Sequence, residues 1–219
     1  MADGVIFDMD GVLVASGRAH DASWKMLAKS RGLSITSEQF AATFGKSSRE
    51  IIRTLWGESI PDADVRAMDD RKEELYRELI TGLVPLTVGV RETLWHLQQA
   101  GYSLAVGTSG PRANVDLVLR ETGMEGFFSA IATGEDVRHG KPAPDVFLLA
   151  AERLKIEPRR CVVIEDAPVG IAAAKTAGMP VIGFVGTHPA EKLRAAGVDH
   201  VATHMRDITP ETIASLLQK

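Results

Sequence analysis

Five short apolar runs in the second half of the chain, each followed by a stretch with helical periodicity, constrain the fold more than any other feature. The runs lie at 102–109, 127–133, 160–166, 179–185 and 198–203. Alternating strand and helix signals predict a parallel sheet. The run CVVI is apolar throughout, which is typical of a strand that helices cover on both faces. The sequence therefore predicts an α/β fold with a doubly wound parallel sheet.

Residues 15–85 break this alternation and show helical patterns only. They include SSREIIRTLWG, which begins with capping serines and stops at Gly57, and the long charged stretch DADVRAMDDRKEELYRELITG. We therefore expect a small all-helical insert at 15–85, placed after the first strand, and an α/β core formed by 1–14 and 86–219. The charged run DDRKEELYRE within the insert is interpreted as a solvated helix face with neighbouring ion pairs.

Composition narrows the classes of function. The 219 residues carry 25 Lys+Arg and 29 Asp+Glu, a net charge of -4, and no long basic stripe, which disfavours a nucleic-acid surface. No apolar stretch approaches the ~20 residues that span a bilayer, and the first apolar run is too short and too charged for a signal peptide. A single cysteine, Cys161, excludes an internal disulfide. We expect a cytoplasmic protein that acts on a small molecule, without nucleic-acid or membrane partners.

Polar and charged side chains gather where the predicted strands end. In chain order they are Asp8, Asp10, Thr108, Ser109, Lys141, Glu165 and Asp166. The carboxyl ends of parallel strands meet at one edge of a sheet, where ligands bind. Carboxylates that converge there would repel one another and raise their pKa values, so a divalent cation is expected among them. Oxygen ligands alone favour Mg²⁺.

The same edge is expected to bind an anion. The Thr108 hydroxyl, the backbone N–H groups after Ser109 and the Lys141 ammonium are donors that suit a phosphate beside the cation. This combination fits phosphoryl transfer, in which one carboxylate attacks and another handles the proton. Taken singly, Thr108 could instead bond its own backbone, and Glu165 with Asp166 could cap the helix expected near Pro168.

Four motifs together resemble the haloacid dehalogenase-like superfamily, in its β-phosphoglucomutase and phosphoglycolate-phosphatase-like branch. They are DMDG, a Thr-Ser pair after the second strand, KPAPDVF and IEDAPVGIAAAKTAGM, and the resemblance covers essentially the whole chain. It implies that Asp8 is the nucleophile and forms an aspartyl-phosphate, and that Asp10 acts first as general acid and then as base. It also implies that Thr108, Ser109 and Lys141 hold the phosphate.

The resemblance further implies a Mg²⁺ site and a substrate-covering cap. Asp8, the backbone carbonyl of Asp10 and Asp166 would bind the ion, with Glu165 in an outer or water-bridged position. The helical insert would be the cap that closes over the substrate. Cap residues with expected substrate contacts are His20, Trp24, Lys46 and Arg49, although Trp24 also has the spacing of a packing residue.

These observations predict a Mg²⁺-dependent phosphatase that hydrolyses a small phosphorylated metabolite, either a sugar phosphate or a phosphoglycolate-like acid. A dehalogenase needs neither Asp10 nor the Glu165-Asp166 pair, and nothing in the sequence supports a catalytically silent binding protein. The alternative is a sugar phosphomutase. Mutases of this branch use a lysine near the end of the long cap helix, where this chain has Glu78, and no lysine follows Lys72, although Arg77 could substitute. The substrate and the oligomeric state are left open.

Overall fold

The structure is a computed structural model that describes residues 3–43 and 46–218. Its centre is a six-stranded sheet in the order β3-β2-β1-β4-β5-β6, and all neighbouring strands pair in parallel. The strands are β1 Gly4–Phe7, β2 Ser103–Gly107, β3 Phe128–Ala132, β4 Cys161–Glu165, β5 Val181–Phe184 and β6 His200–Ala202. The predicted doubly wound parallel sheet is therefore confirmed.

Helices cover both faces of the sheet, because successive side chains of a strand point to opposite faces. Val5 and Phe7 of β1 belong to an apolar cluster with α5, α6 and α10, whereas Ile6 belongs to the cluster on the other face with α7, α8 and α9. These helices are α5 Val90–Gln99, α6 Arg112–Thr122, α7 Asp145–Leu154, α8 Pro168–Thr176, α9 Ala190–Ala195 and α10 Pro210–Leu217, with short 3₁₀ turns at Glu125–Phe127, Pro158–Arg160 and Met205–Asp207.

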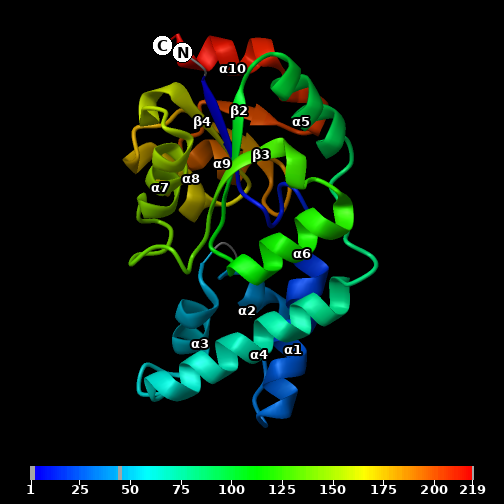
Figure 1. The fold of residues 1–219 in the computed structure, drawn as a ribbon. Coiled ribbons are helices and arrows are strands. Elements are labelled where there is room, and N and C mark those ends of the chain that lie inside the picture. The colour runs from blue at the N-terminus through cyan, green and yellow to red at the C-terminus, as the bar shows by residue number, and fades with distance from the viewer. Residues whose placement is uncertain (1–2, 44–45, 219) are drawn as a thin grey trace.

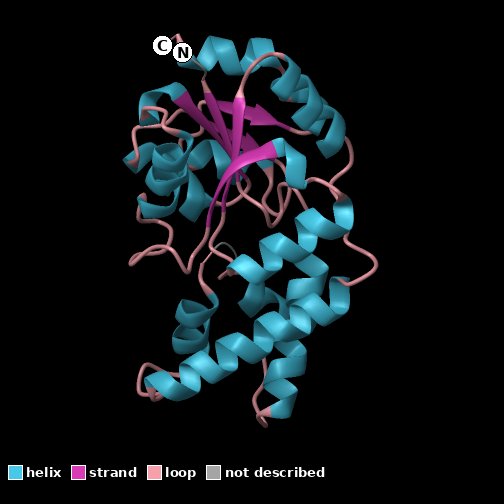
Figure 2. Ribbon diagram, in the orientation of Figure 1, coloured by secondary structure: helices cyan, strands magenta, loops and turns pink. Residues whose placement is uncertain are grey.

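The segment between β1 and β2 is helical and lies beyond the carboxyl ends of the strands (Figure 1). Its helices are α1 Gly17–Ser30, α2 Ser37–Ala41, α3 Ser48–Trp56 and α4 Asp62–Ile80. Figure 2 shows strands at one end of the molecule and helices alone at the other. These helices have an apolar cluster of their own that includes Trp24, Leu27 and Ile52. We refer to α1–α4 as the cap and to the remaining elements as the core, and α2 is the one cap helix that the sequence did not predict.

Two backbone segments connect the cap to the core, and they lie side by side. Ala15 donates from its backbone N–H to the carbonyl oxygen of Pro85 at 2.7 Å, and Thr87 donates to that of Leu13 at 3.0 Å. These bonds join the segment that leaves the core to the segment that returns. Among the described residues, no helix is long and apolar enough to cross a bilayer.

Candidate active site

The candidate site lies at the carboxyl end of β1, where the direction of chain winding reverses. The strand pairing extends one residue past β1, because the backbone N–H of Asp8 donates to the carbonyl of Ile164 in β4 at 3.0 Å. The next two strands in the chain lie to one side of β1, and β4, β5 and β6 lie to the other. Open α/β sheets bind ligands at such a reversal, so the topology alone brings Asp8 and the ends of β2 and β4 together.

Lys141 is buried between two carboxylates. Its Nζ donates to Oδ1 of Asp8 at 3.0 Å and to Oε1 of Glu165 at 2.9 Å, and its side chain is 1% exposed. Burial raises the pKa of Asp8 to about 7, against the lowering effect of Lys141. Burial on its own would lower the pKa of Lys141, but the Asp8 and Glu165 carboxylates raise it above its usual value. An ammonium that stays charged at this place offsets part of the negative charge of the two carboxylates and can donate to an incoming phosphate.

Asp8, Glu165 and Asp166 place carboxylate oxygens within 4.8 Å of one another. The buried Oδ1 of Asp166 has no hydrogen-bond partner among the described residues, whereas its Oδ2 accepts from the backbone N–H of Thr187 at 2.9 Å. An unpartnered buried carboxylate oxygen beside two further acids is the donor set that a hard divalent cation requires. Burial and the Glu165 charge raise the pKa of Asp166 well above its usual value, which a bound cation would reverse.

Backbone at Gly11 passes close to this acid cluster. A Cβ on Gly11 would lie 1.9 Å from Oδ2 of Asp166, and its φ of 82° is in the left-handed region. Glycine is therefore required directly after Asp10. Glu165, which was expected in an outer position, is 0% exposed and accepts from Lys141 and from the backbone N–H of Ala167 at 2.5 Å. The second of these bonds lies just before α8, whose N-cap residue, Ala167, makes no side-chain capping bond.

The Asp10 side chain turns away from the acid cluster and toward the cap. Its Oδ1 accepts from Ser16 Oγ at 2.6 Å, from His20 Nε2 at 2.9 Å and from the Tyr76 hydroxyl at 3.2 Å. Burial alone would raise its pKa, but His20, Ser16 and Lys72 outweigh burial and lower it to about 2. Its Oδ2 lies on the side of Gly110, where a Cβ would be 3.7 Å away. One carboxylate oxygen of Asp10 is thus held by the cap, and the other faces the end of β2.

Thr108 and Ser109 line the pocket directly after β2. Thr108 is buried, and its Oγ1 accepts from the backbone N–H of Gly110 at 3.1 Å. The local backbone contact that the sequence left open is therefore present. The hydroxyl hydrogen of Thr108 remains available to donate to a ligand, because this bond uses only an oxygen lone pair.

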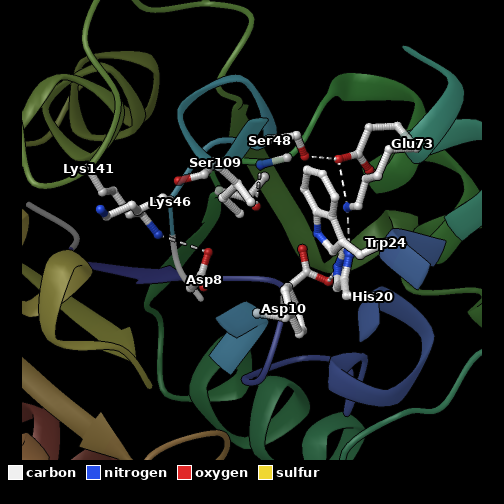
Figure 3. Close-up of a pocket in the computed structure, with 14 residues that line it drawn as sticks. Asp8, Asp10, His20, Trp24, Lys46, Ser48, Glu73, Ser109 and Lys141 are labelled. Carbon is white, nitrogen blue, oxygen red and sulfur yellow. Dashed lines mark hydrogen bonds and ion pairs between the residues drawn. The ribbon is translucent and has the colours of Figure 1, made fainter. Parts of the chain in front are cut away.

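A cavity of about 60 Å³ separates these core residues from the cap. Figure 3 shows Asp8 and Lys141 at one side of it, and Trp24, His20 and Glu73 at the other. Its lining residues are Asp8, Asp10, His20, Trp24, Phe40, Lys46, Ser48, Ile51, Lys72, Glu73, Thr108, Ser109, Gly110 and Lys141. The structure thus places the predicted cap residues His20, Trp24 and Lys46 in the wall. Trp24 is 1% exposed and also belongs to the apolar cluster of the cap.

Lys72 and Glu73 correct the interpretation of DDRKEELYRE as a solvated face. Both are buried and line the cavity, whereas their neighbours Arg71 and Glu74 are exposed and paired with each other. Lys72 Nζ donates to His20 Nδ1 at 2.8 Å and to Glu73 Oε1 at 2.8 Å. Because an ammonium is a donor only, His20 donates from Nε2 to Asp10. A chain of hydrogen bonds therefore runs from Glu73 through Lys72 and His20 to Asp10.

The long cap helix does bring a lysine to the cavity, although the sequence has none after Lys72. Lys72 lines the cavity wall, while Glu78 lies on the exposed face of α4 and accepts from Arg71 at 3.0 Å. A signal was present in the sequence: Lys72 is seven residues after Val65 and four after Met68, on the buried stripe of α4.

Two arginines expected near the substrate lie outside this cavity. Arg49 pairs with Asp69 on α4 at 2.7 Å, and its side chain is 57% exposed. Arg77 donates to Oδ1 of Asn114, in the core helix α6, at 2.9 Å. Both line a neighbouring groove between the cap and core and are absent from the cavity wall. The groove and the cavity share Ser48, Glu73 and Ser109, so the contact of Arg49 with substrate stays a prediction.

Comparison with known proteins agrees with this architecture. The family model for haloacid dehalogenase-like hydrolases matches residues 2–178. The chain is 33% identical over 180 residues to fructose-1-phosphate phosphatase YqaB of Escherichia coli (strain K12), which covers 82% of this chain and 94% of the relative. It is 30% identical over 216 residues to beta-phosphoglucomutase of Bacillus subtilis (strain 168), covering 95% and 92% of the two chains.

A solved structure of beta-phosphoglucomutase from Clostridium difficile has a TM-score of 0.87 to this chain at 25% identity, and covers 100% of this chain and 98% of that one. The similarity includes the helical insert as well as the sheet, because it extends over the full length. The predicted fold is confirmed by this match, and the predicted resemblance is confirmed by the family model and by the relatives. The chain belongs to the haloacid dehalogenase-like hydrolase family.

Proposed function

We propose that the protein is a Mg²⁺-dependent phosphatase that hydrolyses a phosphorylated carbohydrate through an aspartyl-phosphate on Asp8. The observation that carries the proposal is the position of Asp8. Its carboxylate is paired with Lys141, belongs to a three-carboxylate cluster and opens into a cavity whose other end is formed by the cap. Membership of the family and similarity to a named phosphatase make the chain a phosphoric monoester hydrolase.

In the first step of the proposed reaction, an oxygen of Asp8 attacks phosphorus and the bond from phosphorus to the ester oxygen breaks. The electron pair stays on the leaving oxygen, which takes a proton from Asp10. In the second step water attacks the aspartyl-phosphate and gives its proton to Asp10, which releases inorganic phosphate and restores Asp8. A cation held by Asp8, the Asp10 carbonyl and Asp166 would supply positive charge opposite the phosphoryl oxygens.

The contacts of Asp10 decide when it can serve as acid or base. With a pKa of about 2, it is ionised at neutral pH, which suits the base that accepts the proton of water. To protonate the leaving oxygen it must first gain a proton, and a dianionic phosphate nearby favours that by raising its pKa. Thr108 and Lys141 are placed to donate to the phosphoryl oxygens, since both line the cavity beside Asp8.

A sugar phosphomutase is the second candidate, because α4 of the cap brings Lys72 to the cavity wall. The similarity to the Bacillus subtilis beta-phosphoglucomutase points the same way. The two candidates share the first step and differ in what attacks the aspartyl-phosphate. In the phosphatase it is water, and in the mutase it is a hydroxyl of a second sugar phosphate.

Phosphate release from a panel of sugar and sugar-alcohol phosphates tests the proposal. The wild type with Mg²⁺ is expected to release phosphate, Asp8→Asn to release at least 10³-fold less because an amide cannot attack, and Asp116→Asn, an exposed control in α6, to match the wild type. EDTA is expected to abolish release and added Mg²⁺ to restore it. Full activity of Asp8→Asn contradicts the nucleophile. Phosphorus NMR that shows isomerised sugar phosphate without free phosphate contradicts the phosphatase.

A further inference from the structure

We propose that Glu73 is a specificity residue that rejects substrates with a second anionic group, so that the substrate is a monophosphate of a neutral sugar or sugar alcohol. This inference rests on the proposed function and narrows it. It removes bisphosphates, and with them the mutase cycle, and it removes the phosphoglycolate-like acids. The argument depends on where Glu73 is held, on its charge, and on the cations available to offset that charge.

Glu73 is fixed at the cap end of the cavity by three donors. Its Oε1 accepts from Ser48 Oγ at 2.6 Å and from Lys72 Nζ at 2.8 Å, and its Oε2 accepts from Nδ2 of Asn114 at 2.7 Å (Figure 3 shows the Ser48 bond). Asn114 belongs to the core, so the carboxylate joins both halves of the molecule. A side chain bound from three directions cannot swing away from an incoming group.

The Glu73 carboxylate is ionised at neutral pH. Burial alone would raise its pKa, but Lys72, His20 and the Ser48 hydroxyl outweigh burial and lower the pKa below its usual value. Lys72 does not leave a free positive charge behind, since its ammonium lies between Glu73 and the His20–Asp10 pair. A ligand in the cavity therefore meets a negative charge at the cap end.

The cations that line the cavity do not add up to a second phosphate site. Lys141 is engaged by Asp8 and Glu165 at the core end. At the cap end the Lys72 ammonium donates to Glu73 and to His20, which in turn donates to Asp10, so one ammonium serves two carboxylates. Figure 3 shows Lys46 on the other side of the cavity, beside Lys141 and Asp8. A second phosphate or a carboxylate would be desolvated beside Glu73 without net compensation, which makes its binding unfavourable.

The same wall suits a neutral polyol. Trp24, Phe40 and Ile51 give the cavity an apolar side that can pack on the carbon skeleton of a sugar. Ser48 and Glu73 supply oxygen atoms that can accept hydrogen bonds from sugar hydroxyls. A carboxylate that attracts hydroxyl groups and repels anions selects by charge at the end of the substrate remote from the transferred phosphate.

The test compares binding of matched ligands to a protein that cannot turn them over. Calorimetry with Asp8→Asn protein in Mg²⁺ uses fructose 1-phosphate with fructose 1,6-bisphosphate, and glucose 6-phosphate with glucose 1,6-bisphosphate. We expect each bisphosphate to bind at least tenfold more weakly than its monophosphate. Adding Glu73→Gln, which keeps the shape and removes the charge, is expected to strengthen bisphosphate binding about tenfold and to change monophosphate binding less than threefold.

Glu74→Gln is the matched control, because it makes the same charge change one residue along α4 on a side chain that is 56% exposed. It is expected to change neither affinity more than twofold. If Asp8→Asn protein binds bisphosphates as tightly as monophosphates, the inference is overturned. This comparison leaves Glu73 unchanged, so its result does not depend on whether the Glu73→Gln variant folds. The inference is also overturned if Lys46→Met weakens bisphosphate binding tenfold more than monophosphate binding, because Lys46 would then hold the second anionic group.

Binding and turnover fail separately. If the binding assay shows weaker binding of bisphosphates but the wild type releases no phosphate from any sugar phosphate, the phosphatase is refuted and the role of Glu73 stands. Phosphate release by the wild type with equal affinity for mono- and bisphosphates refutes the role of Glu73 and leaves the phosphatase standing.

Discussion

Replacing Lys141 by Met is the perturbation whose effect on stability can be worked most directly from the structure. The Lys141 ammonium is buried against Asp8 and Glu165 at 3.0 and 2.9 Å, and its Nζ lies 4.7 Å from the ring centroid of Phe147. Methionine has a similar volume and packs well against an aromatic ring, so little cavity cost is expected. What remains is the cost of two carboxylates that have lost their cation.

Two estimates of that cost agree. Breaking a buried ion pair by removing one partner costs about 3–5 kcal/mol in other proteins. A carboxylate that has lost its cation can also be neutralised by protonation. Protonation costs about 1.4 kcal/mol for each unit by which the pH exceeds the ordinary pKa of the carboxylate, which is about 5 kcal/mol at pH 8 and about 3 kcal/mol at pH 6. We therefore expect Lys141→Met to lower the free energy of unfolding by about 3–5 kcal/mol at pH 8, and by less at pH 6. At pH 8 the midpoint of thermal unfolding, Tm, should fall by roughly 6–20 °C.

Urea and thermal unfolding in EDTA, at pH 6 and pH 8, measure this loss. Lys175→Met is the matched control, because Lys175 pairs with Asp199 at 2.8 Å on the surface and is 44% exposed, so its removal should cost less than about 1 kcal/mol at either pH. A Lys141→Met loss at pH 8 no larger than that of Lys175→Met would refute the reasoning. A loss in unfolding free energy that grows as the pH falls would also refute it, because protonation at lower pH neutralises the unpaired carboxylates and should reduce the loss.

Three further predictions concern parts of the fold away from the cavity wall. A Cβ on Gly170 would lie 1.7 Å from Oε1 of Glu165, so Gly170→Ala is expected to lower the free energy of urea unfolding by roughly 1–3 kcal/mol. Gly126→Ala is the control, because Gly126 has open space around it, and its effect should stay within about 0.5 kcal/mol. Equal effects of the two substitutions would contradict a steric clash at Gly170. Ser47 caps α3 through a capping box, so Ser47→Ala should cost about 1 kcal/mol in the same assay, and no loss would remove that role. Burial raises the pKa of the Cys161 thiol from 9.0 to about 12. A thiol-specific disulfide reagent at pH 8 should therefore react only after urea unfolding, and rapid reaction of the native protein would contradict this. The free energy of unfolding should also fall as the pH rises above 9, because the unfolded thiol loses its proton first.

Most of the core end of the site was predictable because it depends on topology. Parallel strands always direct their carboxyl ends to one edge of the sheet, so the residues after each apolar run had to meet there. The structure brings Asp8, Thr108, Lys141 and Asp166 into one pocket and acid cluster as expected. Their catalytic and metal-binding roles stay predictions, for which the tests above are designed.

The cap end was predictable only in part. His20 and Trp24 line the cavity, whereas Arg49 pairs with Asp69 and lines the adjoining groove. Lys72 and Glu73 were assigned to solvent, because a charged pair in a charged run ordinarily lies on the exposed face of a helix.

The sequence by itself determined the parallel sheet, the helical insert and the acids at the strand ends, because these follow from local patterns of burial and from the geometry of strands. Only the tertiary structure decided which charges of α4 turn inward. Lys72 and Glu73 can be buried because their partners His20 and Asn114 come from segments 52 and 41 residues away in the chain. A charge is stable in a protein interior only when it is paired, and such pairing is a property of the folded chain.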